Sequence, residues 1–291
     1  AKTWDHLHCG GWEDSHNTVY PAYLVEYEPA ASPSTLPGSV AWIGADKLHT
    51  DGYTGAGVTI GMLGSVSLDP TGLPWTGHNA LAPESAGGNV VNGESDYTLA
   101  STHESAVAGV LVGNDPCGDV QGTGKGYQGV APSARLVCDE VSAAMNIDAR
   151  IASLRDAGAD VVNYSGGFDP GNPWAPEVNR TIDDIVDDDR VAVVVSAGNN
   201  SQGTEIPFPA DAYNVIAVGS LMAEGDLLGG AATWHRASSE NVSGPTSGLY
   251  ATSRRKPDLV APGECIVVDS WTGDADDYDD DGPGSSLAAP H

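Results

Sequence analysis

Val191-Ala192-Val193-Val194-Val195 is a run of five apolar residues, and Ser196-Ala197-Gly198-Asn199 follows it directly. An uninterrupted valine-rich run is typical of a strand that is buried on both faces of a parallel sheet. Similar runs predict further strands at residues 58–63, 136–138, 161–164 and 215–218. Helical patterns lie between these runs, at residues 105–112, 148–156 and 180–187. The alternation predicts a doubly wound α/β fold, a mainly parallel sheet with helices on both faces.

Composition narrows the class of protein. The chain has 291 residues, of which 40% are hydrophobic, so it can bury a substantial core. Its 40 acidic against 12 basic residues give a net charge of -28, which argues against nucleic acid and anionic membranes as partners. No apolar run is long enough to span a membrane. The first residues lack the apolar core of a signal peptide, so we interpret the chain as a mature or trimmed form. The acidic composition is typical of an exported or salt-tolerant protein, and we expect a secreted, extracellular protein.

We expect two regions. Residues 1–50 are rich in Trp, His and Pro, and we interpret them as an irregular N-terminal extension that packs on the domain. Residues 51–291 form that domain. From Gly55 onward, the pattern of apolar residues predicts strands that alternate with helices.

Four cysteines are present: Cys9, Cys117, Cys138 and Cys265. An even number in an exported chain predicts two disulfide bonds, and three connectivities are possible. The short glycine-rich segment between Cys117 and Cys138 favours that pair. Buried free thiols are the alternative.

Three segments carry side chains suited to acyl transfer. Ser286 lies among small residues at the start of a predicted helix, where it could act as a nucleophile. His103 begins an Ala/Val-rich helical segment and could serve as its general base. Asn199 ends the valine-rich strand and could donate a hydrogen bond to an oxyanion. Taken singly, each segment has an ordinary structural explanation; their combination and order favour a hydrolase.

The chain resembles the subtilisin-like serine peptidases (subtilases) from about Gly55 to His291. Residues 102–109 resemble the histidine motif of that family, residues 197–199 its oxyanion motif, and residues 284–291 its nucleophile motif. Residues 160–167 resemble the strand that pairs with substrate, which implies a substrate-binding role for Ser165, Gly166 and Gly167. Further matches lie at residues 129–134, 215–219, 243–246 and 256–263. The resemblance implies a serine endopeptidase with catalytic His103, Ser286 and Asn199, acting on peptides or proteins.

The chain departs from the subtilase pattern in three places. Residues 55–63 resemble the strand that delivers the triad aspartate, yet Gly64 and Ser65 follow it. Asp69 could swing back to supply a carboxylate. Glu104 replaces a family glycine directly after the histidine and is a further candidate to replace the acid. Because helix neighbours face different ways, however, we expect it to be a solvated helix-start residue. The chain also stops at His291, where subtilases continue, so a truncation or a separate C-terminal fragment completing the fold is expected.

Asp277, Asp279 and Asp281 precede Gly282 in the order of a calcium loop, although the distal glutamate of that motif is absent. A structural calcium ion is therefore one interpretation, and a flexible acidic loop is the other. The chemistry itself requires no cofactor. The alternative to a peptidase is a catalytically impaired pseudoprotease that binds peptides or serves as a scaffold, which the missing aspartate favours.

Overall fold

The computed structural model describes residues 38–65, 71–81, 90–115, 126–169, 171–199, 206–224, 233–236, 244–245, 255–268, 272–275, 277–281 and 284–291. Asp69, Cys9 and Cys117 lie outside these ranges. No helix among the described residues is long and apolar enough to cross a membrane.

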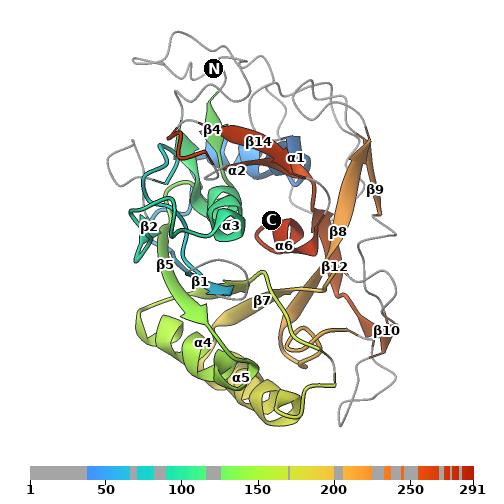
Figure 1. The fold of residues 1–291 in the computed structure, drawn as a ribbon. Helices are drawn as coiled ribbons and strands as arrows, with labels where there is room; N and C mark the ends of the chain where they lie inside the picture. The colour runs from blue at the N-terminus through green and yellow to red at the C-terminus, as the bar shows by residue number, and fades with distance from the viewer. Residues whose placement is uncertain are drawn as a thin grey trace.

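The centre of the fold is a parallel sheet with the strand order β12-β8-β7-β6-β1-β5-β2 (Figure 1). Its strands are β1 (Thr59–Ser65), β2 (Val90–Val91), β5 (Arg135–Val141), β6 (Val161–Tyr164), β7 (Ala192–Ser196), β8 (Ile216–Glu224) and β12 (Leu259–Pro262). All neighbours along this path run parallel, and β9 (Thr233–Arg236) pairs antiparallel with β8. The chain leaves the central strand β1 towards β5 and later continues on its other side from β6. This reversal of strand order creates the crevice in which α/β proteins bind ligands.

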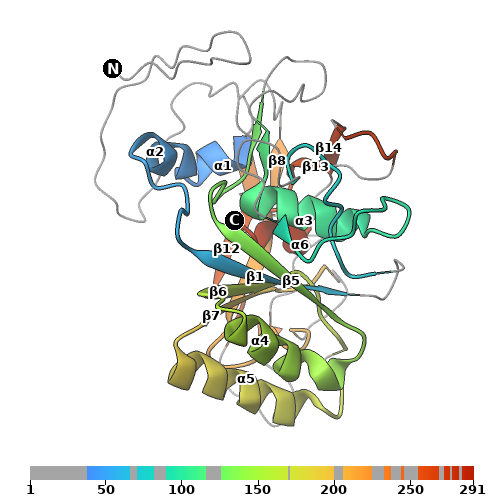
Figure 2. The same ribbon diagram turned by 90° about the vertical axis from the view of Figure 1, so that its left-hand side faces the viewer.

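Helices cover both faces of the sheet. Helices α4 (Ile147–Asp156) and α5 (Ala175–Asp189) lie together on one face, while α3 (Thr102–Val112) and the short α6 (Ser285–Ala288) lie on the other (Figures 1 and 2). The sequence of α5 explains its orientation, because its apolar residues recur at helical spacing. Val178, Ile182 and Ile185 are buried, whereas the acidic residues between them face outward. A 3₁₀ turn, η2 (Ala144–Asn146), precedes α4.

The smaller elements are α1 (Gly38–Trp42), α2 (Ala45–Thr50) and three two-stranded hairpins. The hairpins pair β3 (Asn114–Asp115) with β4 (Tyr127–Gln128), β10 (Gly244–Pro245) with β11 (Arg255–Lys256), and β13 (Cys265–Val268) with β14 (Tyr278–Asp281).

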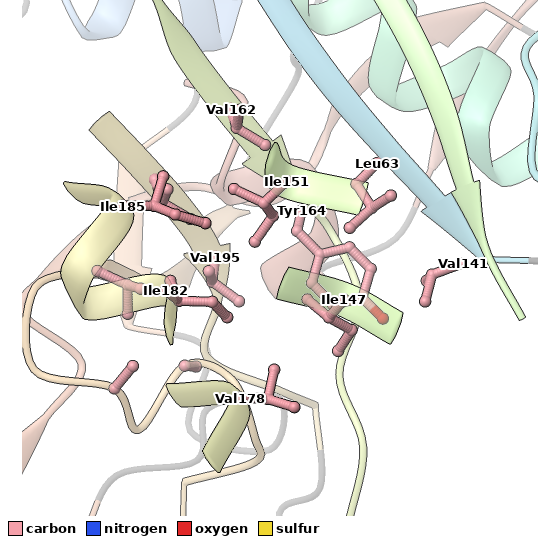
Figure 3. Close-up of a cluster of buried hydrophobic side chains, with 14 of the residues drawn as sticks. Leu63, Val141, Ile147, Ile151, Val162, Tyr164, Val178, Ile182, Ile185 and Val195 are labelled. Carbon is pink, nitrogen blue, oxygen red and sulfur yellow. The ribbon is translucent and has the colours of Figure 1, made fainter. Parts of the chain in front are cut away.

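Each face of the sheet has its own apolar core. One core packs α4 and α5 against β6 and β7, and Figure 3 shows Ile151, Ile182 and Val195 meeting there around Tyr164. The other core joins α3 to β1, β5, β13 and α6, with Met62, Val107 and Leu287 among its members. This second core places the starts of α3 and α6 on the same side of the sheet.

The predicted doubly wound α/β fold is confirmed. The five predicted strands correspond to β1, β5, β6, β7 and β8, and the three predicted helices to α3, α4 and α5. The prediction of an irregular segment up to residue 50 is wrong for residues 38–50, which form α1 and α2. Within residues 38–50, Nε2 of His49 lies 2.8 Å from the Val130 carbonyl oxygen. The packing of an extension over residues 1–50 stays a prediction, because residues 1–37 lie outside the described ranges.

The predicted disulfide between Cys117 and Cys138 is wrong, because Cys138 is a free thiol. Cys265 is also free, and both side chains are buried in the apolar core beneath α3. Burial raises the pKa of the Cys138 thiol, because the thiolate would lose its hydration. The alternative of buried free thiols therefore holds for these two residues.

Candidate active site

The predicted site residues come from separate parts of the chain but gather at the carboxyl edge of the sheet. Strand β1 ends at Ser65, β6 ends just before Ser165, and β7 leads into Asn199. Helix α3 carries His103 in its first turn and α6 carries Ser286 in its first turn. These two helices pack against each other. Parallel strands deliver their ends to one edge, which explains why residues so distant in sequence converge.

Ser286 is held against the end of β6. Its hydroxyl Oγ donates to the Ser165 carbonyl oxygen at 3.1 Å, and the Ser165 Oγ donates to the Ser286 carbonyl oxygen at 2.6 Å. The buried Asn163 side chain in turn donates to the Ser165 Oγ at 3.0 Å. This network connects the candidate nucleophile with a segment predicted to bind substrate. The hydroxyl proton is directed at Ser165 in this arrangement.

Asn199 is positioned by Ser285, a residue that the sequence analysis did not single out. The Asn199 Oδ1 accepts hydrogen bonds from the Ser285 backbone N–H at 2.7 Å and from the Ser285 Oγ at 2.6 Å. Gly198 donates its own N–H to the same Oγ and has a φ of +94°, a left-handed conformation that favours glycine. The turn after β7 is therefore fixed by a buried serine hydroxyl.

The space beside the Gly284 Cα, where a side chain would begin, lies close to two hydrogen-bond donors. Gly284 has an extended backbone, and a Cβ added there would lie 3.5 Å from the Asn199 Nδ2 and 3.9 Å from the Ser286 backbone nitrogen. A glycine at this position keeps that space free. Two N–H donors that flank a free space can stabilise a developing oxyanion.

The expectation that Glu104 is a solvated helix-start residue is wrong. Its side chain is only 4% exposed, and its Oε1 lies 3.1 Å from Nδ1 of His103, whose side chain is 44% exposed. The same oxygen accepts the Ser65 backbone N–H at 3.2 Å. The neighbours meet because the glutamate side chain has three rotatable bonds, so its carboxylate is not restricted to the direction of its Cβ.

The sequence contains a pattern that predicts the position of Glu104 in α3. Ser101 and Glu104 have the S-x-x-E spacing of a helix capping box, which places Glu104 in the first turn of α3. The Ser101 Oγ does accept the Glu104 backbone N–H at 3.1 Å.

Gly64 lies where the subtilase pattern expects the acidic residue, and it has no room for a side chain. A Cβ built there would collide with the Gly72 carbonyl oxygen and lie 3.1 Å from the Glu104 carboxyl carbon. Gly72 is fixed in place, since its N–H donates to the Glu140 Oε2 at 3.0 Å. The space beside β1 is therefore occupied by the residue 71–73 segment and by Glu104.

Residues 165–167 follow β6 and retain backbone groups for a ligand. The Gly166 carbonyl oxygen accepts the Ser196 Oγ at 3.3 Å. Gly167 is exposed and makes no hydrogen bond to the described part of the chain. Beyond it, Phe168 and Phe208 exchange backbone hydrogen bonds. An extended peptide could add its own backbone at this short exposed segment.

The candidate calcium residues lie in and just before a strand. Tyr278–Asp281 is strand β14, paired with β13, and Asp277 precedes it. The Asp277 Oδ2 accepts the Thr272 hydroxyl at 2.7 Å, and Asp279 is exposed. Over the described ranges, no three His, Cys, Asp or Glu side chains lie close enough to hold a metal ion. Calcium binding by Asp277, Asp279 and Asp281 stays a prediction.

Comparison with known proteins places this architecture in a family. The family model described as "Subtilase family" matches residues 68–291, well over half of the chain. The chain therefore belongs to the subtilase family.

Its relatives are distant. Subtilisin DY of Bacillus licheniformis is 29% identical over 64% of this chain and 65% of its own length. Subtilisin E of Bacillus subtilis is 24% identical over 88% of this chain and 59% of its own length. The chain thus spans less than two thirds of these relatives.

Solved structures support the same fold. The patellamide maturation protease PatG has a TM-score of 0.58 at 18% identity, covering 85% of this chain and 77% of its own. The prenylagaramide maturation protease PagA has a TM-score of 0.57, also at 18% identity, covering 85% of this chain and 76% of its own.

Proposed function

We propose that this chain is a serine endopeptidase that hydrolyses peptide bonds through an acyl-enzyme at Ser286. The observation that carries the proposal is the arrangement around Gly284. The serine backbone N–H and the Asn199 amide lie within 4 Å of one open point beside the candidate nucleophile. A serine that only capped a helix would need no second donor there. Membership of the subtilase family supports the same reaction class.

In the proposed reaction, the Ser286 hydroxyl first exchanges its Ser165 acceptor for the Nε2 atom of His103. The Oγ then bonds to the scissile carbonyl carbon while His103 takes the proton. The carbonyl oxygen becomes an oxyanion that accepts from the Asn199 Nδ2 and the Ser286 N–H. Collapse breaks the C–N bond, and His103 returns the proton to the leaving amine. Water then repeats the sequence and releases the acid.

The proposed substrate is a peptide or a protein segment in an extended conformation. Its backbone would pair beside Ser165, Gly166 and Gly167, so main-chain hydrogen bonds would supply affinity and side-chain pockets selectivity. Two of the structural neighbours are described as maturation proteases, and a third structure is described as the PatG macrocyclase in complex with peptide, which supports this class of substrate. Secretion is proposed from the composition alone.

The test is to treat the chain with a fluorophosphonate probe and to locate the adduct by mass spectrometry. We expect modification of Ser286, hydrolysis of an unstructured protein substrate, and loss of both in Ser286→Ala. A folded protein that neither reacts nor hydrolyses any of a broad peptide library contradicts the proposal. That outcome, combined with peptide binding measured by calorimetry, would indicate the pseudoprotease alternative.

A further inference from the structure

We propose that Glu104 is the carboxylate that positions His103, so that the acidic member of the site has moved from the end of β1 to the first turn of α3. This inference rests on the proposed peptidase function and assigns a role that Gly64 and Ser65 cannot fill. Glu104 acts through His103 and not on the substrate, so it is a positioning residue.

The contact has the geometry that the role requires. The Glu104 Oε1 lies 3.1 Å from Nδ1 of His103. An ionised carboxylate only accepts hydrogen bonds, so Nδ1 must carry the proton and Nε2 keeps its lone pair for the serine hydroxyl. The exposed imidazole is accessible to substrate, whereas the carboxylate is shielded from water. Shielding strengthens its interaction with the imidazolium that forms during catalysis.

The local hydrogen bonds explain why this carboxylate is available. In a complete capping box, the glutamate side chain would accept the backbone N–H of Ser101. Here that N–H donates instead to the Leu73 carbonyl oxygen at 2.9 Å. The other hydrogen bond of the capping box is present, because the Glu104 backbone N–H donates to the Ser101 Oγ. The Glu104 Oε1 contacts Nδ1 of His103 and accepts the Ser65 backbone N–H.

The tertiary structure makes the acid at position 104 and an acid at position 64 mutually exclusive. A Cβ at Gly64 would lie 3.1 Å from the Glu104 carboxyl carbon. The carboxylate therefore occupies the region that a side chain from the end of β1 would enter. The Ser65 N–H, which donates to Glu104 at 3.2 Å, ties the relocated carboxylate to the same strand end.

Among the described residues, no second cation pairs with the Glu104 carboxylate. Within the ranges that the structure describes, His103 is the single ion-pair partner of Glu104. Its buried neighbours are neutral groups whose ionisation it opposes: burial, and secondarily the Glu104 charge, raise the pKa of the Tyr164 hydroxyl. A buried carboxylate beside one imidazole is suited to holding it in a single tautomer.

The test compares Glu104→Gln with Glu140→Gln. Glutamine at 104 keeps an oxygen that can accept the Ser65 N–H but removes the charge. We expect kcat for a chromogenic peptide, and the rate of fluorophosphonate labelling, to fall by about 10³- to 10⁴-fold with little change in KM. Glu140 also accepts a backbone N–H beside Gly64, yet it does not contact His103, so its variant should keep the parental kcat.

Each outcome decides a different claim. If Glu104→Gln is folded and its kcat lies within about tenfold of the parent, Glu104 is not the positioning carboxylate. If the parent itself does not turn over or label, the peptidase function fails and this inference fails with it. If Glu104→Gln does not fold, Glu104→Asp replaces it. The shorter carboxylate should lower kcat by at least about tenfold at unchanged Tm, and a parental kcat there overturns the proposal.

Discussion

The Ser285 backbone N–H donates to Oδ1 of Asn199 at 2.7 Å, and this contact determines which way the Asn199 amide faces. A backbone N–H can only donate, so the atom that it contacts must be the amide oxygen. The Nδ2 group is thereby left on the side of Gly284 and Ser286. Ser285 thus orients the donor that the proposed reaction at Ser286 would use.

Replacing Asn199 by aspartate tests this orientation. Aspartate has nearly the same shape and can still accept from Ser285, but it presents a negative oxygen where Nδ2 was. We expect kcat to fall by at least about 10²- to 10³-fold, since an oxyanion donor is lost, while KM stays near the parental value. Steady-state kinetics on a peptide substrate check this. An active Asn199→Asp variant would remove Asn199 from the oxyanion site.

Gly284→Ala tests the space between the two donors. The backbone there is extended, so alanine adopts it without strain, and the nearest atoms would be in ordinary contact. We expect an unchanged Tm but a loss of about 10²-fold or more in kcat, because the methyl group occupies the place of the oxyanion. A variant with parental kinetics would show that the carbonyl oxygen binds elsewhere. Gly171→Ala, where a methyl group meets only the Asp169 carboxylate at 3.2 Å, is the control.

Gly64→Asp should not restore a conventional acid. Its Cβ would collide with the Gly72 carbonyl oxygen, so the variant must move the segment around Gly72 in order to fold. We expect a large loss of stability, on the order of 2 kcal/mol or more, by overpacking. Thermal unfolding measures it. Combining the change with Glu104→Gln should give no recovery of activity; a stable and active double variant would contradict this account of the site.

His291 should contribute a pH dependence to stability. Burial lowers the pKa of His291 to about 4, although its hydrogen bond to the Leu287 carbonyl oxygen opposes the shift. The unfolded chain binds the proton near pH 6.5 and the folded chain only near 4, so stability is lost as the pH falls through this window. Between pH 7 and 4.5 we expect His291→Gln to lose about 2 kcal/mol less than the parent. Urea unfolding in a Ser286→Ala background, which prevents self-digestion, measures the difference; equal losses would contradict it.

Cys138 and Cys265 should both react with a thiol reagent once the chain is unfolded without reductant. They are buried free thiols, so the native protein should protect them. Alkylation followed by peptide mass mapping distinguishes the two states. Failure of either residue to react in denaturant, before reduction, would mean that it forms a disulfide.

The sequence determined the central layers of this protein. Buried parallel strands are apolar on both faces, so an apolar run such as residues 191–195 predicts a strand without knowledge of distant contacts. The buried face of α5 can be predicted because its apolar residues recur at helical spacing. His103, Asn199 and Ser286 could be selected because each stands at a recognisable junction of strand or helix. The edge strand β12 was missed because it is short, ends in proline and exposes Leu259 and Val260.

Only the tertiary structure decided which carboxylate meets His103. That choice depends on the distance between the end of β1 and the start of α3, on the room left at Gly64 by Gly72, and on where the Ser101 N–H donates. The state of Cys138 and the pairing of residues 278–281 with β13 were decided in the same way. Local patterns report which residues are buried, but contacts between distant segments depend on how loops close and which rotamers the packing allows. The sequence therefore indicated that an acid was missing from its usual place, and the packed structure brought Glu104 to His103.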